Sequence, residues 1–152
     1  MKRAILTFAS LLLLIVPVIH SARAANLDAL DPSSVAQLEL KASHAGVREQ
    51  TFLYTELVHV YSQLAGQELA GGQSGQAQAT LKKMQDFISR IHIGLSANAH
   101  KLKRSEMLLE ACSFRMSQLA HHASSEDQPA LTATLEQIDK VHEEMLTQVF
   151  AH

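Results

Sequence analysis

The chain has no tryptophan, one cysteine, two tyrosines, three prolines and six glycines among its 152 residues. One cysteine cannot form an internal disulfide, so the fold must be stabilised by an apolar core. β-Branched residues are scattered, and no alternating run of apolar and polar residues reaches a useful length, which argues against a β-sheet. Because helix-breaking residues are rare, the composition favours long helices.

Charge is missing from residues 5–19, which are mostly apolar and follow two basic residues. Ala22-Arg23-Ala24 then places small residues at both positions that a signal peptidase recognises. A helix that spans a bilayer needs about 20 apolar residues, and this stretch is shorter. The pattern predicts a signal peptide over residues 1–24 that is cleaved before Ala25, with a retained membrane anchor as the alternative.

After cleavage we expect one α-helical domain, residues 25–152, in the periplasm of a bacterium or in its medium. Cleavage removes three of the thirteen basic residues and none of the fifteen acidic ones, which leaves ten against fifteen, a net charge of about −5. An acidic chain is poorly suited to bind nucleic acid or anionic membranes. We therefore predict no nucleic-acid partner, and no membrane partner after cleavage.

Thirteen positions in the second half of the chain repeat with steps that alternate between four and three residues, and eleven of them are apolar or small and apolar. We call these positions the seam. They are Ala77, Leu81, Met84, Ile88, Ile91, Leu95, Asn98, Leu102, Ser105, Leu109, Cys112, Met116 and Leu119. Such a repeat lines one side of a helix with side chains that a partner helix can cover. It predicts an all-α protein, an antiparallel helical bundle or coiled-coil hairpins.

The seam predicts one long central helix over residues about 75–123, flanked by shorter antiparallel helices. Gly94 is its weak point, but a glycine inside a helix costs only about 1 kcal/mol relative to alanine. The seam keeps its phase through this region, which a loop would not require. The alternative is a break near residues 93–99, which would give a compact four-helix up-down bundle.

Turn signals place the other helices. Ser33 or Ser34 is expected to cap a first short helix that ends near Gly46. A second helix is expected over residues 47–70, before the glycine-rich turn at residues 71–75.

Ser74 of this turn is expected to cap the central helix. The second turn is expected over residues 124–129, with Asp127 as the cap of the last helix and Pro129 in its first turn. The last helix continues the four-three rhythm through His142, so it is expected to pack on the C-terminal half of the central helix, and the second helix on the N-terminal half.

Metal and cofactor motifs are absent from the sequence. No two histidines stand three or four residues apart, and HExxH and CxxCH do not occur. His121 or His122 with Glu126 and Asp127 is the one grouping that could bind a metal adventitiously. Cys112 is predicted to be a buried apolar residue because it lies on the seam, with an intermolecular disulfide as the alternative. We predict no metal site, no cofactor and no catalytic residues.

His142 occupies an apolar stripe, where counting back across the second turn places it near Ser105, Glu106 and Leu109. We expect it to be a core polar group paired with Glu106, a contact that a proton gained at mildly acidic pH would strengthen. The polar seam residues Asn98 and Ser105 make the middle of the central helix its least well-packed part.

Four short pieces of the chain carry a resemblance. They are residues 26–30 (NLDAL), 75–79 (GQAQA), 100–103 (HKLK) with Glu106, and 126–129 (EDQP). The chain resembles a group of uncharacterised small secreted bacterial α-helical proteins in which a signal peptide precedes a helical hairpin bundle. The resemblance implies the fold and an exported location, and it implies no activity.

The sequence favours a non-enzymatic periplasmic or secreted helical protein that acts through protein–protein contact or self-association. The reason is the long seam, whose polar middle two shorter helices would leave open to a partner. The alternative is a periplasmic helical bundle that binds a small ligand or a metal. An enzyme is not predicted, because no acid, base and nucleophile converge in the sequence.

Overall fold

The computed structural model describes residues 31–96 and 99–151, so the predicted signal peptide and Asn98 lie outside the described residues. Its helices are α2 (Pro32–His44), α3 (Val47–Ala70), α4 (Ser74–Leu95), α5 (Leu102–His122) and α6 (Gln128–Phe150). These two ranges contain no strand. The predicted all-α bundle is therefore confirmed.

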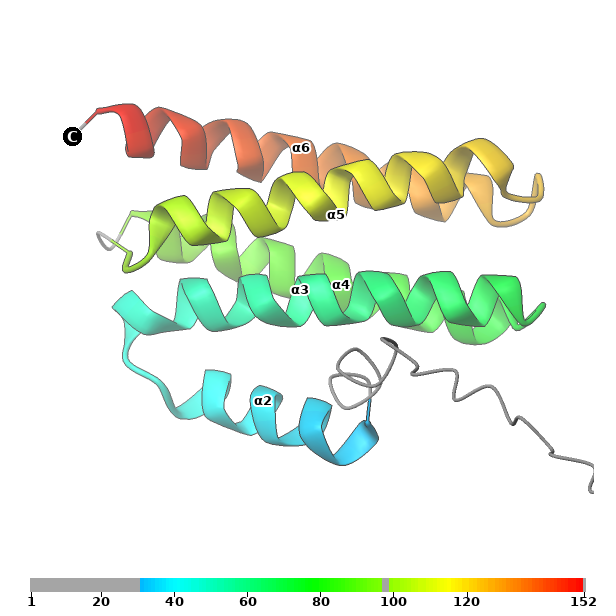
Figure 1. The fold of residues 1–152 in the computed structure, drawn as a ribbon, viewed down its shortest axis with the longest axis horizontal. Coiled ribbons are helices and arrows are strands. Elements are labelled where there is room, and N and C mark those ends of the chain that lie inside the picture. The colour runs from blue at the N-terminus through cyan, green and yellow to red at the C-terminus, as the bar shows by residue number, and fades with distance from the viewer. Residues whose placement is uncertain (1–30, 97–98, 152) are drawn as a thin grey trace, which may run out of the picture.

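The helices α3 and α4 form one antiparallel hairpin, and α5 and α6 form a second one (Figure 1). In the bundle α3 also packs against α5, and α4 packs against α6. Across the described residues, α4 and α5 share no close backbone contact. The four helices therefore stand at the corners of a square with α4 and α5 diagonally opposite, while α2 lies outside the square on α3.

The core lies between these four helices and takes in the seam from both halves. Leu81, Met84, Ile88 and Ile91 of α4 are almost fully buried, and so are Leu109, Cys112 and Met116 of α5. They join the inner side chains of α3 and α6 in one cluster. Burying each large apolar side chain stabilises the fold by about 1.5–3 kcal/mol. The prediction that Cys112 is a buried apolar residue is confirmed.

The predicted continuous helix over residues 75–123 is wrong, because α4 ends at Leu95 and α5 begins at Leu102. The alternative, a break near residues 93–99 within a four-helix bundle, is confirmed. The break lets α5 fold back onto α3, so both halves of the seam are buried in one core. That burial outweighs the few helical hydrogen bonds that a continuous helix would add.

Two of the predicted helix caps are different in the structure. Asp31, not Ser33 or Ser34, is the N-cap of α2, and its carboxylate accepts a hydrogen bond from the Ser34 backbone N–H at 3.2 Å. Position 73, not Ser74, precedes α4. Asp127 does precede α6 as predicted, although its side chain does not cap that helix.

Candidate functional site

A groove runs between α2 and α4 over the surface of α3, and we call it the α2–α4 groove. Its volume is about 390 Å³ near Lys83 and about 270 Å³ near Ile93, and the two parts share Ser43, Tyr54 and Arg90. The groove exists because, within the described residues, the backbone of α2 lies close to α3 and not to α4, which leaves the side of α4 uncovered. Its position therefore depends on the helix that sits outside the square.

Aromatic rings form the floor of the α2–α4 groove. The rings of Tyr54 and Phe87 are stacked with centroids 5.8 Å apart, and Tyr61 lies beside Phe87 at 5.6 Å. The Arg90 guanidinium lies over the Tyr54 ring at 5.6 Å and donates a long hydrogen bond of 3.4 Å to its hydroxyl. A cation held on a ring in this way keeps most of its donors available to an incoming carboxylate.

An ion pair ties α2 to α4 at one end of this groove. The Lys83 ammonium lies 2.5 Å from the Glu39 carboxylate, which also accepts a hydrogen bond from the Tyr61 hydroxyl. Burial and the bond to Glu39 raise the pKa of Tyr61. Burial works against the Lys83 cation, but its bonds to Glu39 and Tyr61 outweigh that effect and raise the pKa of Lys83. These three groups are satisfied by one another, so Arg90 is the cation of the groove that is best placed for a ligand.

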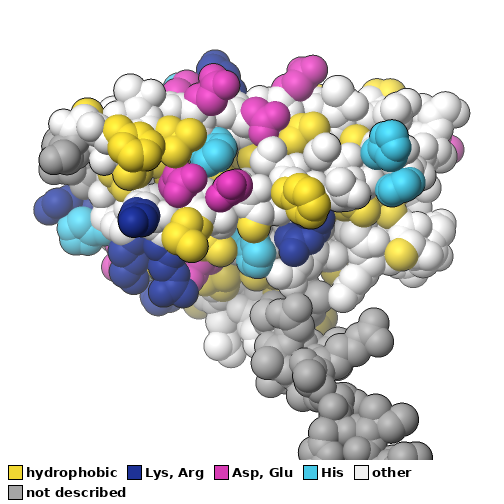
Figure 2. Space-filling view, turned by 45° about the horizontal axis from the view of Figure 1, so that its top comes forward, with side chains coloured by type: hydrophobic (Ala, Val, Ile, Leu, Met, Phe, Trp, Pro, Cys, Tyr) yellow, Lys and Arg dark blue, Asp and Glu magenta, His cyan; other side chains and the backbone are white. Residues whose placement is uncertain are grey.

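Large exposed apolar side chains gather along the same groove. Leu40 is 60% exposed, Val47 is 58% exposed and Ile93 is 71% exposed, and all three line it. On the face formed by α5 and α6, hydrophobic side chains instead lie between acidic residues and histidines (Figure 2). Three exposed apolar side chains on one groove are the arrangement expected of a contact surface.

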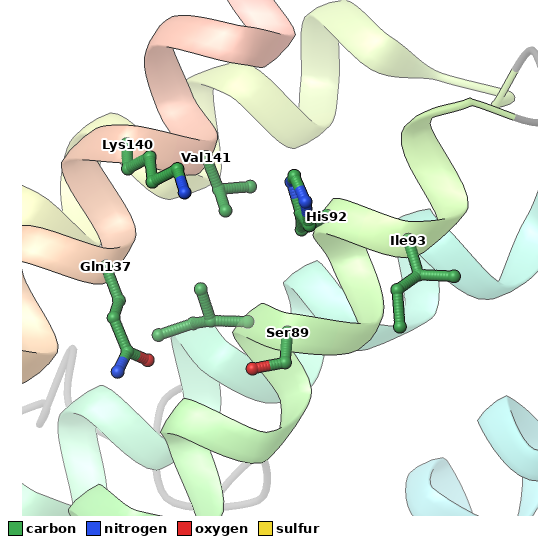
Figure 3. Close-up of a pocket in the computed structure, with 7 residues that line it drawn as sticks. Ser89, His92, Ile93, Gln137, Lys140 and Val141 are labelled. Carbon is green, nitrogen blue, oxygen red and sulfur yellow. The ribbon is translucent and has the colours of Figure 1, made fainter.

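A smaller groove of about 210 Å³ separates α4 from α6 (Figure 3). Ile88 and Val141 are its almost fully buried apolar lining residues, and the side chains of His92 and Lys140 lie on opposite sides of it. The His92 ring nitrogen Nδ1 lies 2.5 Å from the Glu144 carboxylate. Pockets for organic ligands usually measure about 300–1,000 Å³, so this groove is small for a cofactor.

Cys112 and His59 meet where α5 packs on α3, with the Cys112 sulfur 3.8 Å from His59 Nδ1. Arg115 of α5 donates a hydrogen bond of 2.7 Å to the Ser62 hydroxyl beside them. Burial raises the pKa of Cys112 to about 11 and, together with the Arg115 charge, lowers the pKa of His59. Both groups are therefore neutral at pH 7, and a buried thiol of this kind is a poor nucleophile.

The predicted pair between His142 and Glu106 is present, with Nε2 of His142 3.0 Å from the Glu106 carboxylate. Ser105 is fully buried as a seam residue, and its hydroxyl has no hydrogen-bond partner within the described residues. The rings of His121 and His122 meet edge to face, with centroids 5.1 Å apart. No group of three or more His, Cys, Asp or Glu side chains that could hold a metal occurs in residues 31–96 and 99–151.

Asp127 links the two hairpins at the end of the bundle where their turns lie. The residue is only 4% exposed, and its carboxylate accepts hydrogen bonds of 2.9 Å from the hydroxyls of Ser124 and Ser74. The amide of Gln78 donates a weaker one at 3.4 Å. The bonds from Ser124 and Ser74 lower the pKa of Asp127. The residue that the sequence assigns as a local cap thus joins α4 to the turn before α6.

No pattern in the sequence predicts the α2–α4 groove. Arg90 and Lys83 stand on α4 among other polar residues, and no spacing marks them as a site. The one sequence feature that indicates this groove is Ile93. It is an apolar residue between Ile91 and Leu95 that lies off the seam, where an exposed position is expected.

Comparison with protein-family models, with curated proteins and with solved structures gives no match to this chain. None of the helices in the described part is both long and apolar enough to cross a membrane. The resemblance to small secreted bacterial helical proteins and the exported location stay predictions.

Proposed function

We propose that this chain is an exported, non-enzymatic helical protein that acts by binding another protein in the α2–α4 groove. The observation that carries the proposal is the row of exposed apolar side chains, Leu40, Val47 and Ile93, beside the Arg90 cation. The seam, which in the sequence favours a partner, is mostly buried in the core against α3 and α6. We therefore propose that the contact surface lies on the outside of the bundle.

The expected partner segment is an amphipathic helix with an acidic residue. The groove follows α4 from Lys83 to Gly94, which at 1.5 Å per residue is about 16 Å, or three helical turns. Three turns of a partner helix would place two or three apolar side chains against Leu40, Val47 and Ile93. A carboxylate on the same face would pair with the Arg90 guanidinium and fix the register.

The absence of catalysis is part of the proposal. The buried Cys112 thiol is neutral at pH 7 and is closed off from solvent, so the pair with His59 has no reactive thiolate to offer. The pair of His142 and Glu106 joins α5 to α6 and lines neither groove.

The test begins with a photo-crosslinking amino acid at position 93, incorporated into the protein in a bacterial periplasm, and the same amino acid at position 114. Phe114 is the matched control, because it is 69% exposed on α5, outside the groove. The crosslinked protein is identified by mass spectrometry, and its binding to the purified chain is then measured by calorimetry.

We expect Arg90→Glu and Ile93→Asp each to weaken that binding about tenfold or more, as for central residues of an interface, and Phe114→Asp to leave it unchanged. Equal binding by all three variants would contradict the proposal. A rise in melting temperature with zinc, copper or haem would instead support the ligand-binding alternative, because a ligand of the native state stabilises it.

A further inference from the structure

The groove between α4 and α6, which we call the α4–α6 groove, contains a polar atom that the fold leaves unsatisfied. The described residues contain four buried side-chain oxygens without a hydrogen-bond partner, which belong to Thr51, Glu68, Ser105 and Gln137. Of these four residues, Gln137 alone lines this groove. A buried acceptor without a partner destabilises a fold, so its presence in a native structure calls for an explanation.

The Gln137 amide lies at the wall of the α4–α6 groove because of its place on α6. Its neighbour Ile138 is fully buried in the core, whereas Gln137 is half-buried at the edge of that core. In Figure 3 the Gln137 side chain stands on α6 with its amide oxygen turned toward α4, where Ser89 lies. The Ser89 hydroxyl donates its hydrogen to the Gln85 carbonyl at 3.0 Å, so it does not satisfy this oxygen.

An apolar surface adjoins this oxygen in the α4–α6 groove. Ile88 and Val141, which are 1% and 3% exposed, line it from α4 and α6. The groove measures about 210 Å³, and an apolar cavity of about 150 Å³ is enough to bind benzene. It therefore offers room for one small ring system and not for a larger cofactor.

Lys140 supplies a cation on the same side of the α4–α6 groove. It follows Gln137 by three residues on α6, so the two side chains share a helix face. Within residues 31–96 and 99–151, the Lys140 ammonium makes no ion pair. On the opposite side the Glu144 carboxylate already pairs with His92. An incoming anion would therefore meet an available cation at Lys140.

From these observations we propose that the α4–α6 groove binds a small aromatic carboxylate that carries an N–H or O–H donor. Its ring lies against Ile88 and Val141, its donor satisfies the Gln137 amide oxygen, and its carboxylate pairs with the Lys140 ammonium. A leucine at position 137 would serve folding better than this amide, and such a sacrifice of stability is typical of a binding residue.

This site is separate from the proposed partner site in the α2–α4 groove. Only Ile93 borders both grooves, so the variants that test the ligand site are placed on α6 alone. The two proposals can therefore fail independently.

The test compares three fluorescent probes, which are indoleacetic acid, its N-methyl derivative and indole. The N-methyl derivative lacks the donor, and indole lacks the carboxylate. Because the chain has no tryptophan, the anisotropy of indole fluorescence reports only the bound probe. The variants are Gln137→Leu and Lys140→Gln. Lys82→Gln is the matched control, because Lys82 is an exposed lysine of α4 that does not line the groove.

We expect Gln137→Leu to weaken the binding of indoleacetic acid about three- to tenfold, as the loss of one hydrogen bond does, and to leave that of the N-methyl derivative unchanged. Lys140→Gln should weaken the binding of indoleacetic acid about two- to fivefold at low salt and leave that of indole unchanged. Lys82→Gln should alter none of these affinities. Without a probe, Gln137→Leu should melt no lower than the wild type, because it removes an unsatisfied acceptor.

The absence of saturable binding by any probe at millimolar concentration would overturn the proposal. Equal binding of indoleacetic acid by the wild type and both α6 variants would also overturn it, since the ligand would then lie elsewhere. A lower melting temperature for Gln137→Leu would show that the amide is satisfied in the native state, which would remove the basis of the proposal. Arg90→Glu, which tests the α2–α4 groove, should leave the binding of indoleacetic acid unchanged.

Discussion

At Gly94, α4 comes so close to α3 that an added β-carbon would overlap the Thr51 hydroxyl oxygen. Thr51 is fully buried, and its hydroxyl has no hydrogen-bond partner among the residues that the structure describes. The two residues therefore form a close contact between the helices in which the Thr51 hydroxyl makes no stabilising hydrogen bond. The free energies of unfolding of variants at Gly94 and Thr51 can therefore show whether this close contact is the reason for a glycine at position 94.

We predict that Gly94→Ala destabilises the protein by about 1–3 kcal/mol, as overpacking of a core does. Thr51→Ala removes the clashing oxygen and leaves ordinary contact, so the double variant should recover most of the loss. Gly75→Ala is the matched control, because it lies in the same helix with open space around it and should stabilise the helix slightly. Urea unfolding gives all four free energies. If the double variant is no more stable than Gly94→Ala, the clash with Thr51 is not the reason.

His59 makes stability depend on pH. Its pKa is lowered in the folded protein by burial and by the Arg115 charge, while the unfolded chain keeps the ordinary value of about 6.5. Above pH 6.5 both states are neutral and stability is complete. As the pH falls, the unfolded state takes up the proton first, so stability decreases until the folded state is protonated as well.

We therefore expect the wild type to lose more stability between pH 7.5 and pH 5 than His59→Gln, which cannot titrate. Denaturant midpoints at several pH values measure the difference, and the other histidines are common to both proteins. Parallel curves for the two proteins would mean that His59 is not desolvated in the folded state.

The Asp127 network acts at the scale of elements, because it joins the start of α4 to the turn before α6. Its lowered pKa means that the contribution is present above the ordinary carboxyl pKa and is lost as the pH falls through the folded value. We predict that Asp127→Asn lowers the melting temperature at pH 7 and reduces the further loss between pH 5 and pH 2.

Asp86→Asn is the control for this prediction, since Asp86 is an exposed carboxylate of α4. If Asp127→Asn behaves like this control at every pH, the hydrogen bonds from Ser74 and Ser124 do not stabilise the packing of the two hairpins.

The helices themselves were largely predictable from local signals. The bounds of α3, residues 47–70, agree with the prediction, and the glycine turn and the turn before Pro129 are where their residues indicate. The break after Leu95 was not predicted as the favoured structure, because the local cost of Gly94 is small. It follows from the burial gained when α5 folds back on α3, which only the assembled core provides.

The α2–α4 groove also could not be predicted from the sequence, because it depends on how separate helices are arranged. The sequence predicts α2 and α4 but not that, within the described residues, the backbone of α2 lies close to α3 and not to α4, and the groove depends on that placement. By contrast, the pair of His142 and Glu106 was predictable because both residues are positioned by the hairpin register. Contacts within a hairpin follow from spacing, and contacts between separate elements do not.

At the scale of the whole molecule, the apolar seam is buried inside a compact four-helix core, so any partner must bind outside that core. The amino end of α4 and the carboxyl end of α5 then lie at the same end of the bundle (Figure 1). In one continuous helix, the exposed residues Gln76 and Gln118 would be about 63 Å apart instead, at 1.5 Å per residue.

The most direct test is the distance between spin labels on cysteines introduced at positions 76 and 118 in the dilute monomer, measured by double electron–electron resonance. Cys112 is buried with a pKa of about 11, so it should remain unlabelled. The account predicts one short distance, about 20–30 Å, the width of a small helical bundle with its labels. A single distance near 60 Å in the monomer would show an unbroken central helix and contradict the account.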